Sequence, residues 1–162
     1  MKFDNLVCER AGDVLKVVLN RPTKLNSLSL GLLRDLRDCA EAIEFYKRAL
    51  GAQEVSRMPA PDGKTIWHAE LRIGDSILFM NDEMPGMGRS APTPEAPVPV
   101  TMWLYVQDCD AAFRRAVQAG AKETMKPEDM FWGDRCAGVA DPYGYLWSFA
   151  THQKDLTEEE MR

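Results

Sequence analysis

The sequence lacks the features that mark several large classes of protein. No apolar run reaches the roughly 18 residues that a membrane helix needs. The first residues, Met1 to Asn5, have no apolar signal-peptide core. The chain has 20 Lys and Arg against 25 Asp and Glu, mixed along its length, whereas nucleic-acid binding needs a basic face. We therefore expect a cytoplasmic protein with neither a membrane nor a nucleic-acid partner.

Cysteine and histidine are both scarce. None of the four cysteines forms a C-x-x-C pair, which argues against zinc-ribbon and thioredoxin-like proteins. We expect these cysteines, Cys8, Cys39, Cys109 and Cys136, to be reduced and packed as small apolar side chains. The two histidines are His68 and His152.

An internal repeat with an offset of about 70 residues is the most informative pattern present. Asp38-Cys39 recurs as Asp108-Cys109, and each pair opens a run with helical spacing of apolar residues. Asp38 is a helix N-cap with Glu41 as its capping-box partner. The helices, expected over 40–50 and 110–119, end at Gly51 and Gly120, which suit a left-handed stop position.

Short strands separated by turns follow the first helix, and another strong strand opens the second half. We expect strands over 52–58, 65–73, 76–81, 100–106 and 145–151. In this scheme Leu71 and Trp67 lie in the core, and Trp147 and Phe149 face the helices. Each half therefore follows the pattern of a helix and three strands, with one further strand before the helix.

The domain boundaries follow from the repeat and from proline content. A domain over 28–153 comprises a first repeat, 28–83, a linker rich in proline and glycine, 84–99, and a second repeat, 100–153. An extra segment, 1–27, contains strands over 5–10 and 14–20, and the tail, 154–162, is expected to be a short exposed helix. Whether 28–38 forms a strand or extends the first helix stays open, because Leu32, Leu33 and Leu36 also have helical spacing.

These motifs carry a family resemblance. The stretches 42–52, 67–76, 131–135 and 141–145 resemble the PhnB-like branch of the glyoxalase/bleomycin-resistance (vicinal oxygen chelate) superfamily. The resemblance implies an α+β fold in which two βαβββ modules form a curved mixed sheet around a cavity, often in a homodimer. The first 39 residues resemble instead the opening of an enoyl-CoA hydratase (crotonase), without the parts of that family that build its active site.

Catalytic members of the superfamily place His or Glu metal ligands at four strand positions. Alignment on the helix starts and on the glycine turns at Gly74 and Gly144 puts those positions at Gly31, Leu78, Thr101 and Ser148. Leu78 cannot donate and hydroxyls are weak ligands for a divalent metal. We therefore expect neither a metal nor another cofactor.

The remaining candidates suit a mostly apolar site for a small molecule. By alternation along strands and by position in a loop, we expect the ligand to contact Leu78, Met80, Thr101, Trp103, Tyr105, Trp132, Asp134, Arg135 and Ser148. His68 and Glu70 are the candidate catalytic pair, although a purely structural pair is the alternative. His152, at a strand end, is expected to be simply exposed.

The sequence therefore predicts a metal-independent small-molecule-binding protein. A drug-sequestering binder similar to bleomycin-resistance proteins is the first alternative, and a divalent-metal lyase of the glyoxalase type is the second. A net charge of −5 favours neutral or cationic ligands.

Overall fold

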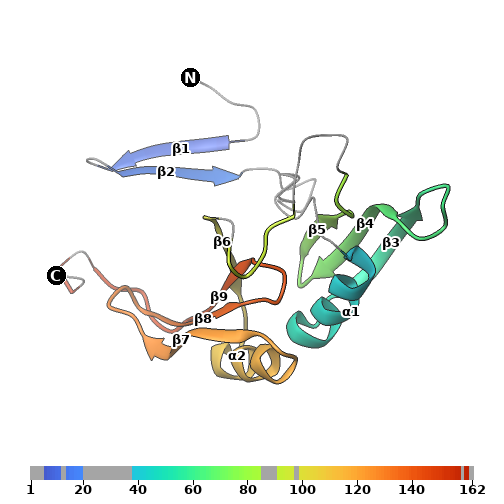
Figure 1. The fold of residues 1–162 in the computed structure, drawn as a ribbon. Helices are drawn as coiled ribbons and strands as arrows, with labels where there is room; N and C mark the ends of the chain where they lie inside the picture. The colour runs from blue at the N-terminus through green and yellow to red at the C-terminus, as the bar shows by residue number, and fades with distance from the viewer. Residues whose placement is uncertain are drawn as a thin grey trace.

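The structure is a computed structural model that describes residues 6–11, 14–19, 38–84, 91–96, 99–157 and 159–160. It contains a two-stranded hairpin, a three-stranded sheet and a four-stranded sheet, with one helix packed on each of the two larger sheets (Figure 1). No helix within these ranges has the length and apolar character needed to cross a membrane.

The second module is the complete one. Its elements are β6 (Thr101–Tyr105), α2 (Cys109–Gln118), β7 (Lys122–Asp129), β8 (Asp134–Ala140) and β9 (Leu146–His152). The strands lie in the order β6-β9-β8-β7, in which β6 is parallel to β9 and the other pairs are antiparallel. This is the βαβββ arrangement expected from the resemblance.

The first module repeats this arrangement without its opening strand. Its elements are α1 (Cys39–Leu50), β3 (Gln53–Pro59), β4 (Ile66–Ile73) and β5 (Ser76–Met80). The strands lie in the order β3-β4-β5, so β5, the counterpart of β9, is an edge strand among the described residues. Residues 28–37, for which strand and helix were both considered, lie outside the described part, as does Gly31.

Both helices begin at their predicted caps and α1 ends at its predicted glycine, whereas α2 ends at Gln118 with Ala119, and not Gly120, as its C-cap. The Asp38 carboxylate accepts a hydrogen bond of 2.8 Å from the Glu41 amide, and Asp108 caps α2 in the same way through Ala111. Gly51 takes the left-handed conformation at φ +67°, and its amide donates to the Tyr46 carbonyl, which ends α1.

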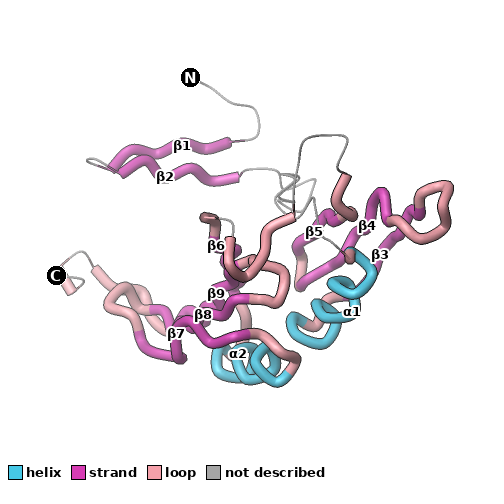
Figure 2. The backbone as a smooth tube through the Cα atoms, in the orientation of Figure 1, coloured by secondary structure: helices cyan, strands magenta, loops and turns pink. Residues whose placement is uncertain are grey.

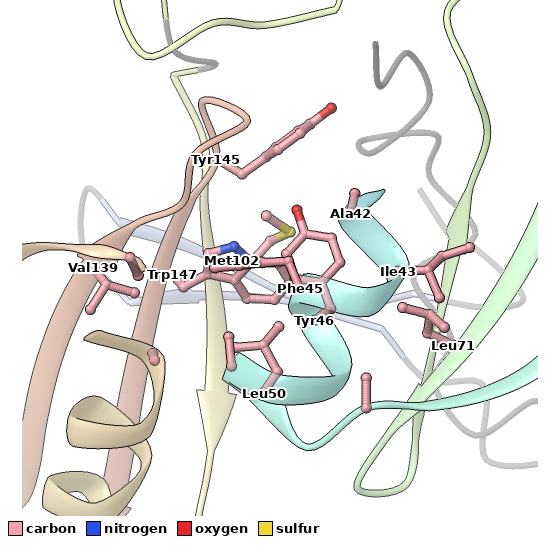
Figure 3. Close-up of a cluster of buried hydrophobic side chains, with 14 of the residues drawn as sticks. Ala42, Ile43, Phe45, Tyr46, Leu50, Leu71, Met102, Val139, Tyr145 and Trp147 are labelled. Carbon is pink, nitrogen blue, oxygen red and sulfur yellow. The ribbon is translucent and has the colours of Figure 1, made fainter. Parts of the chain in front are cut away.

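One core joins the two modules. Ile43 and Leu71 of the first module and Val139 and Phe149 of the second are all buried in the same apolar cluster (Figure 3). The ring of Tyr46 in α1 lies 5.5 Å, centroid to centroid, from that of Trp147 in β9. The predicted inward placement of Leu71, Trp147 and Phe149 is confirmed, but Trp67 is 48 % exposed and the prediction that it lies in the core is wrong.

A buried carboxylate fixes the turn between β8 and β9 to α1. Asp141 accepts hydrogen bonds from the Tyr46 hydroxyl at 2.7 Å and from the Trp147 indole at 2.9 Å, and also from the amides of Tyr143 and Tyr145. Burial raises the pKa of Asp141 even though four donors stabilise its charge. The Asp-Pro-Tyr-Gly-Tyr motif, 141–145, is therefore a structural joint between the modules.

The N-terminal hairpin consists of β1 (Leu6–Ala11) and β2 (Val14–Leu19), paired antiparallel with Leu6 opposite Leu19. These strands match the predicted pair within one residue at each end. In the tube view the hairpin stands apart from both larger sheets (Figure 2). The linker 84–99 is described in part and holds one isolated bridge between Thr93 and Ala96.

Candidate functional site

The four-stranded sheet has one face covered by helices and one face that we call the open face. Strand register places Trp103 beside Ser148 and Tyr105 beside Ala150, so these four residues share the open face. Trp103 and Tyr105 are 46 % and 67 % exposed, whereas Ser148 is 9 % exposed. Two large aromatic rings next to a recessed hydroxyl suit contact with a planar small molecule.

A polar group, the Asp134 cluster, stands at one end of the open face and comprises Tyr105, Trp132, Asp134 and His152. Asp134 is 4 % exposed and sits directly opposite His152 in the β8–β9 register. Its Oδ2 accepts from the Tyr105 hydroxyl at 2.9 Å and from the Trp132 indole at 3.1 Å, and its Oδ1 accepts from Nδ1 of His152 at 2.8 Å.

The electrostatics of the cluster follow from these bonds. Burial works to raise the pKa of Asp134, but the hydrogen bonds from His152, Tyr105 and Trp132 together outweigh it and lower the pKa. The same carboxylate raises the pKa of His152, with a further contribution from Asp155, whose Oδ1 is 3.2 Å from Nε2. Asp134 therefore holds a tyrosine, a tryptophan and a histidine in fixed positions around one charge.

Backbone hydrogen bonds between the loop that carries Trp132 and the tail after His152 support this cluster. The amides of Gln153 and Lys154 both donate to the carbonyl of Gly133, at 3.0 and 3.2 Å. Gly133 has φ +96°, and a Cβ there would lie 2.1 Å from the Lys154 carbonyl oxygen. The loop that carries Trp132 and the tail that follows His152 are therefore in direct backbone contact.

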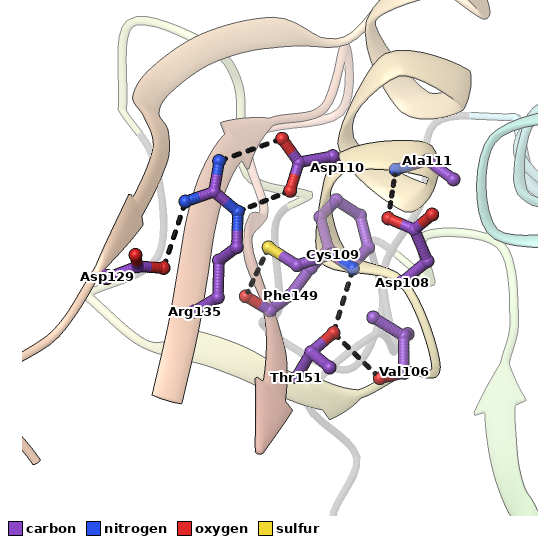
Figure 4. A network of polar contacts seen from close by, with 9 residues as sticks. All are labelled: Val106, Asp108, Cys109, Asp110, Ala111, Asp129, Arg135, Phe149 and Thr151. Atoms are coloured by element: carbon purple, nitrogen blue, oxygen red, sulfur yellow. Dashed lines mark hydrogen bonds and ion pairs between the residues drawn. The ribbon is translucent and has the colours of Figure 1, made fainter. Parts of the chain in front are cut away.

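Arg135 takes no part in this cluster. It follows Asp134 in β8, so its side chain emerges on the helix-covered face. There its guanidinium pairs with both oxygens of Asp110 in α2 and, at 3.0 Å, with Asp129 (Figure 4). The structure thus separates Arg135 from Trp132 and Asp134, with which it was grouped as a ligand contact.

The first module has an open face of its own. His68 and Glu70 lie there, with Nε2 of His68 3.2 Å from Oε1 of Glu70. Phe79 is opposite Glu70 in the β4–β5 register, and its ring lies 5.1 Å from that of His68. The expected catalytic pair is therefore a half-exposed pair beside an aromatic ring, and this geometry fits the structural alternative as well as a catalytic one.

Leu78 and Met80 face the other way, which corrects the expectation that they share the ligand face. Their register partners are Leu71 and Ala69, and Met80 is 1 % exposed within the core below α1. Leu78 does line a cavity of about 90 Å³ between β5 and β6, together with Trp103 and Met102.

Leu78 and Met80 lie on an unexpected face because the offset between the two repeats changes from 70 to 69 residues along the chain. The first residues of the helices, Cys39 and Cys109, are 70 positions apart, but the groups that bind their amides, Asp82 and Thr151, are 69 apart. A shift of one residue turns every side chain of a strand to the other face. Phe79, and not Leu78, is consequently the counterpart of Ser148.

Weak donors occupy the chelating positions that the structure describes. Of the four chelating positions, three are now Phe79, Thr101 and Ser148, which offer one aromatic ring and two hydroxyls. Among the residues that the structure describes, no three His, Cys, Asp or Glu side chains gather in a way that could hold a metal ion.

His152 belongs to the site, although its role there was not predicted from the sequence. Its position at the end of β9, opposite a charged residue that begins β8, was visible in principle from the strand pattern. The expectation of a simply exposed side chain holds in part, since His152 is 51 % exposed while paired with Asp134.

Comparisons with known proteins agree with this architecture. The profile of the Glyoxalase/Bleomycin resistance protein/Dioxygenase superfamily matches residues 36–149. Protein Rv0887c of Mycobacterium tuberculosis is 44 % identical over 128 residues, covering 77 % of this chain and 75 % of that protein. Protein At5g48480 of Arabidopsis thaliana is 30 % identical over 136 residues, covering 79 % of this chain and 80 % of that protein.

Solved structures show the same fold. TioX from Micromonospora sp. ML1 superimposes with a TM-score of 0.57 at 28 % identity, over 74 % of this chain and 94 % of TioX. The Arabidopsis thaliana At5g48480 product gives a TM-score of 0.56 at 29 % identity, over 72 % of this chain and 90 % of that chain. The repeated modules, the shared core and these matches together show that the chain belongs to the glyoxalase/bleomycin resistance protein/dioxygenase superfamily.

Proposed function

We propose that this protein binds a small planar molecule on the open face of the four-stranded sheet and does so without a resident metal. The observation that carries the proposal is the Asp134 cluster, which fixes the exposed ring of Tyr105 next to that of Trp103. An aromatic pair held in place loses little conformational freedom when a ligand stacks on it, and this favours binding.

The polar atoms at the site would orient such a ligand. Ser148 lies beside Trp103 in the β6–β9 register, and Nε2 of His152 is 3.2 Å from Oδ1 of the exposed Asp155. Thr101 continues the same face at the start of β6, directly opposite Leu146. A few fixed polar groups on a mainly aromatic surface are typical of small-molecule sites.

The charge of the protein favours a cationic ligand. The net charge is −5, and aromatic rings attract cations through their faces. Sequestration of a cationic drug is therefore the second candidate function. Membership of the PhnB-like branch, which rests on the combination of stretches 42–52, 67–76, 131–135 and 141–145, is part of the same proposal. A cytoplasmic setting, which rests on the lack of apolar segments in the sequence, is another part.

A fluorescence titration tests the proposal with two planar dyes, cationic acridine orange and anionic anilinonaphthalene sulfonate. We expect Trp103→Ala to weaken binding of the preferred dye at least tenfold, because stacking area is lost. Trp67→Ala is the matched control, since Trp67 is 48 % exposed, close to the 46 % of Trp103, but lies on the first sheet. Equal effects of the two substitutions would contradict the proposed site.

Elemental analysis tests the second part of the proposal. We expect the purified protein to contain no stoichiometric divalent metal, and we expect chelation to leave both the melting temperature and dye binding unchanged. A bound metal whose removal lowers the melting temperature would contradict a metal-independent site.

A further inference from the structure

We propose that the ligand of the open face is a planar aromatic carboxylate, whose anionic group lies against Lys122, Thr124 and Ser148 and whose rings lie beside Trp103. This rests on the proposed function and names the chemical class that the same site selects. It is carried by a buried hydroxyl, by a hollow at one end of the sheet and by the placement of charge along the open face.

Ser148 is a buried polar residue on the open face. Its side chain is 9 % exposed, and among the residues that the structure describes none forms a hydrogen bond with its hydroxyl. It stands between Trp103 of β6 and Gly138 of β8 in the sheet register. A buried hydroxyl costs free energy unless a partner satisfies it, so a polar group of a ligand at this point would supply the missing bond.

The Thr124 hydroxyl lies beside the same point. Gly138 has no side chain, and a Cβ built there would lie 2.8 Å from Oγ1 of Thr124 and 3.3 Å from Cβ of Met125. Thr124 therefore takes the space of a side chain at position 138, which is about 5 Å from the side chain of its register partner Ser148. Two hydroxyls at this separation can both donate to one carboxylate.

A hollow of about 380 Å³ lies at this end of the sheet, and its lining includes Thr124. Lys122 lies opposite Ala140, and Ala140 opposite Leu146, so these three residues line the hollow from the open face. Leu146 precedes Ser148 by two positions, and successive positions on one face of a strand are roughly 6–7 Å apart. A ligand two rings long that contacts the side chain next to Ser148, that of Trp103, therefore also reaches the hollow.

The charges of the open face are separated along its strands. Asp134 stands at one end, and Glu128, opposite Cys136, is the next acidic residue on this face. Lys122 stands at the other end, and within the described ranges it forms no ion pair. An anionic group is therefore stabilised at the Lys122 end and repelled at the Asp134 end, which fixes the direction in which the ligand lies.

The carboxylate of Asp141 does not cancel this preference, although Asp141 also lines the hollow. Its oxygens accept from the Tyr46 hydroxyl and the Trp147 indole in the core, so its charge is already engaged there. The net charge of −5 acts on the approach of a ligand from a distance, whereas salt screens distant charges and leaves the bound ligand to its immediate neighbours.

Isothermal titration calorimetry on the full chain tests the proposal with three probes of the same shape. The probes are 2-naphthoate, 2-naphthamide and 2-naphthamidine, which carry a negative, a neutral and a positive group on one ring system. We expect 2-naphthoate to bind about tenfold more tightly than 2-naphthamide, the difference expected for one hydrogen bond to a charged group, and 2-naphthamidine to bind least tightly.

Two substitutions assign this preference to the residues named. Lys122→Met should lower the affinity for 2-naphthoate to that for 2-naphthamide, and Lys64→Met, which removes the same charge from an exposed turn of the first module, is the matched control. Ser148→Ala should weaken both of these probes roughly threefold or more. Its melting temperature should stay unchanged, because within the described structure the hydroxyl has no partner to lose.

Equal affinities for the three probes, or a preference for 2-naphthamidine, would overturn the carboxylate. Equal effects of Lys122→Met and Lys64→Met would overturn it as well, since the charge would then act without contact. Trp103→Ala separates this outcome from the proposed function, because it should weaken all three probes whichever of them binds best. No effect of Trp103→Ala would contradict the proposed site itself, and no binding of any probe would contradict both.

Discussion

At the scale of single residues, Asp134 organises the open face. Its two oxygens accept from the Tyr105 hydroxyl in β6, from the indole of Trp132 in a loop and from His152 in β9. A carboxylate with three donors already in place is better suited to positioning these side chains than to reacting itself. This assigns the chemistry of the site to the groups that surround Asp134.

The substitution Asp134→Asn tests that role. It removes the charge and replaces one accepting oxygen with an NH2 group that can only donate, so we expect a loss of about 1–3 kcal/mol in the free energy of unfolding and weaker binding of the dye. Asp129→Asn is the control, because Asp129 forms a surface pair with Arg135 at 3.0 Å and surface pairs contribute about 0–1 kcal/mol. Urea unfolding followed by circular dichroism measures both, and equal losses would argue against the proposed role.

The pH dependence of stability follows from the pair formed by His152 and Asp134. The pKa of His152 is raised above its ordinary 6.5, so its contribution is complete below pH 6.5 and is lost as the pH rises through the folded-state value. The pKa of Asp134 is lowered below 3.8, so its contribution is present above pH 3.8 and is lost as the pH falls through the lowered value. We expect a stability maximum between these limits.

Denaturation at a series of pH values measures this effect. His152→Gln should abolish the decline on the alkaline side of the maximum, while His68→Gln should retain it because His68 lies outside the cluster. A decline that persists unchanged in His152→Gln would contradict the assignment.

At the scale of elements, the contact between the Trp132 loop and the tail depends on one glycine. In Gly133→Ala the new Cβ would meet the Lys154 carbonyl oxygen at 2.1 Å, in addition to the strain of φ +96°. Gly63→Ala is the matched control, with φ +68° and open space around the position. We expect about 1–2 kcal/mol of destabilisation from backbone strain at Gly63 and a larger loss at Gly133, with altered tryptophan emission. Equal losses in the free energy of unfolding would mean that the tail moves away from the new Cβ at little cost.

The positions of the helices and strands were predictable from local sequence patterns. The face of each strand that points toward the core was not. Caps and stops at Asp38, Gly51 and Asp108 depend on neighbouring residues, and the structure confirms them. The faces of Leu78 and Trp67 depend on register, which is set by turn length and by a bulge between β3 and β4 near Met58. Sequence periodicity gives alternation but does not say which alternate set faces the core.

At the scale of the whole molecule, the two modules share one core and are joined by a buried polar contact at Asp141. Tyr46 of α1 donates to Asp141, and the rings of Tyr46 and Trp147 are in contact across the modules. Domains that share a core unfold together. The fold as a whole was predictable because the repeat identified two copies of one unit, while the joint was not, since it depends on contacts 95 residues apart.

The substitution Tyr46→Phe tests this joint. It leaves Asp141 with one donor fewer at a buried site, so we expect a loss of about 1–3 kcal/mol and a lower melting temperature within a single calorimetric transition. Tyr143→Phe should cost less, because the backbone amide of Tyr143, and not its hydroxyl, donates to Asp141. Two separate transitions in either variant would show that the modules are independent.

The turns that precede β5 and β9 differ in length, and this has a consequence for protein engineering. Gly74 and Asp75 alone separate the paired residues Ile73 and Ser76, whereas 141–145 separate Ala140 from Leu146. Anyone who wished to install a chelating pair by symmetry would substitute Phe79, beside His68, together with Ser148. A carboxylate introduced at Leu78 would instead face the apolar core against which Leu78 packs, on the side of the sheet away from His68.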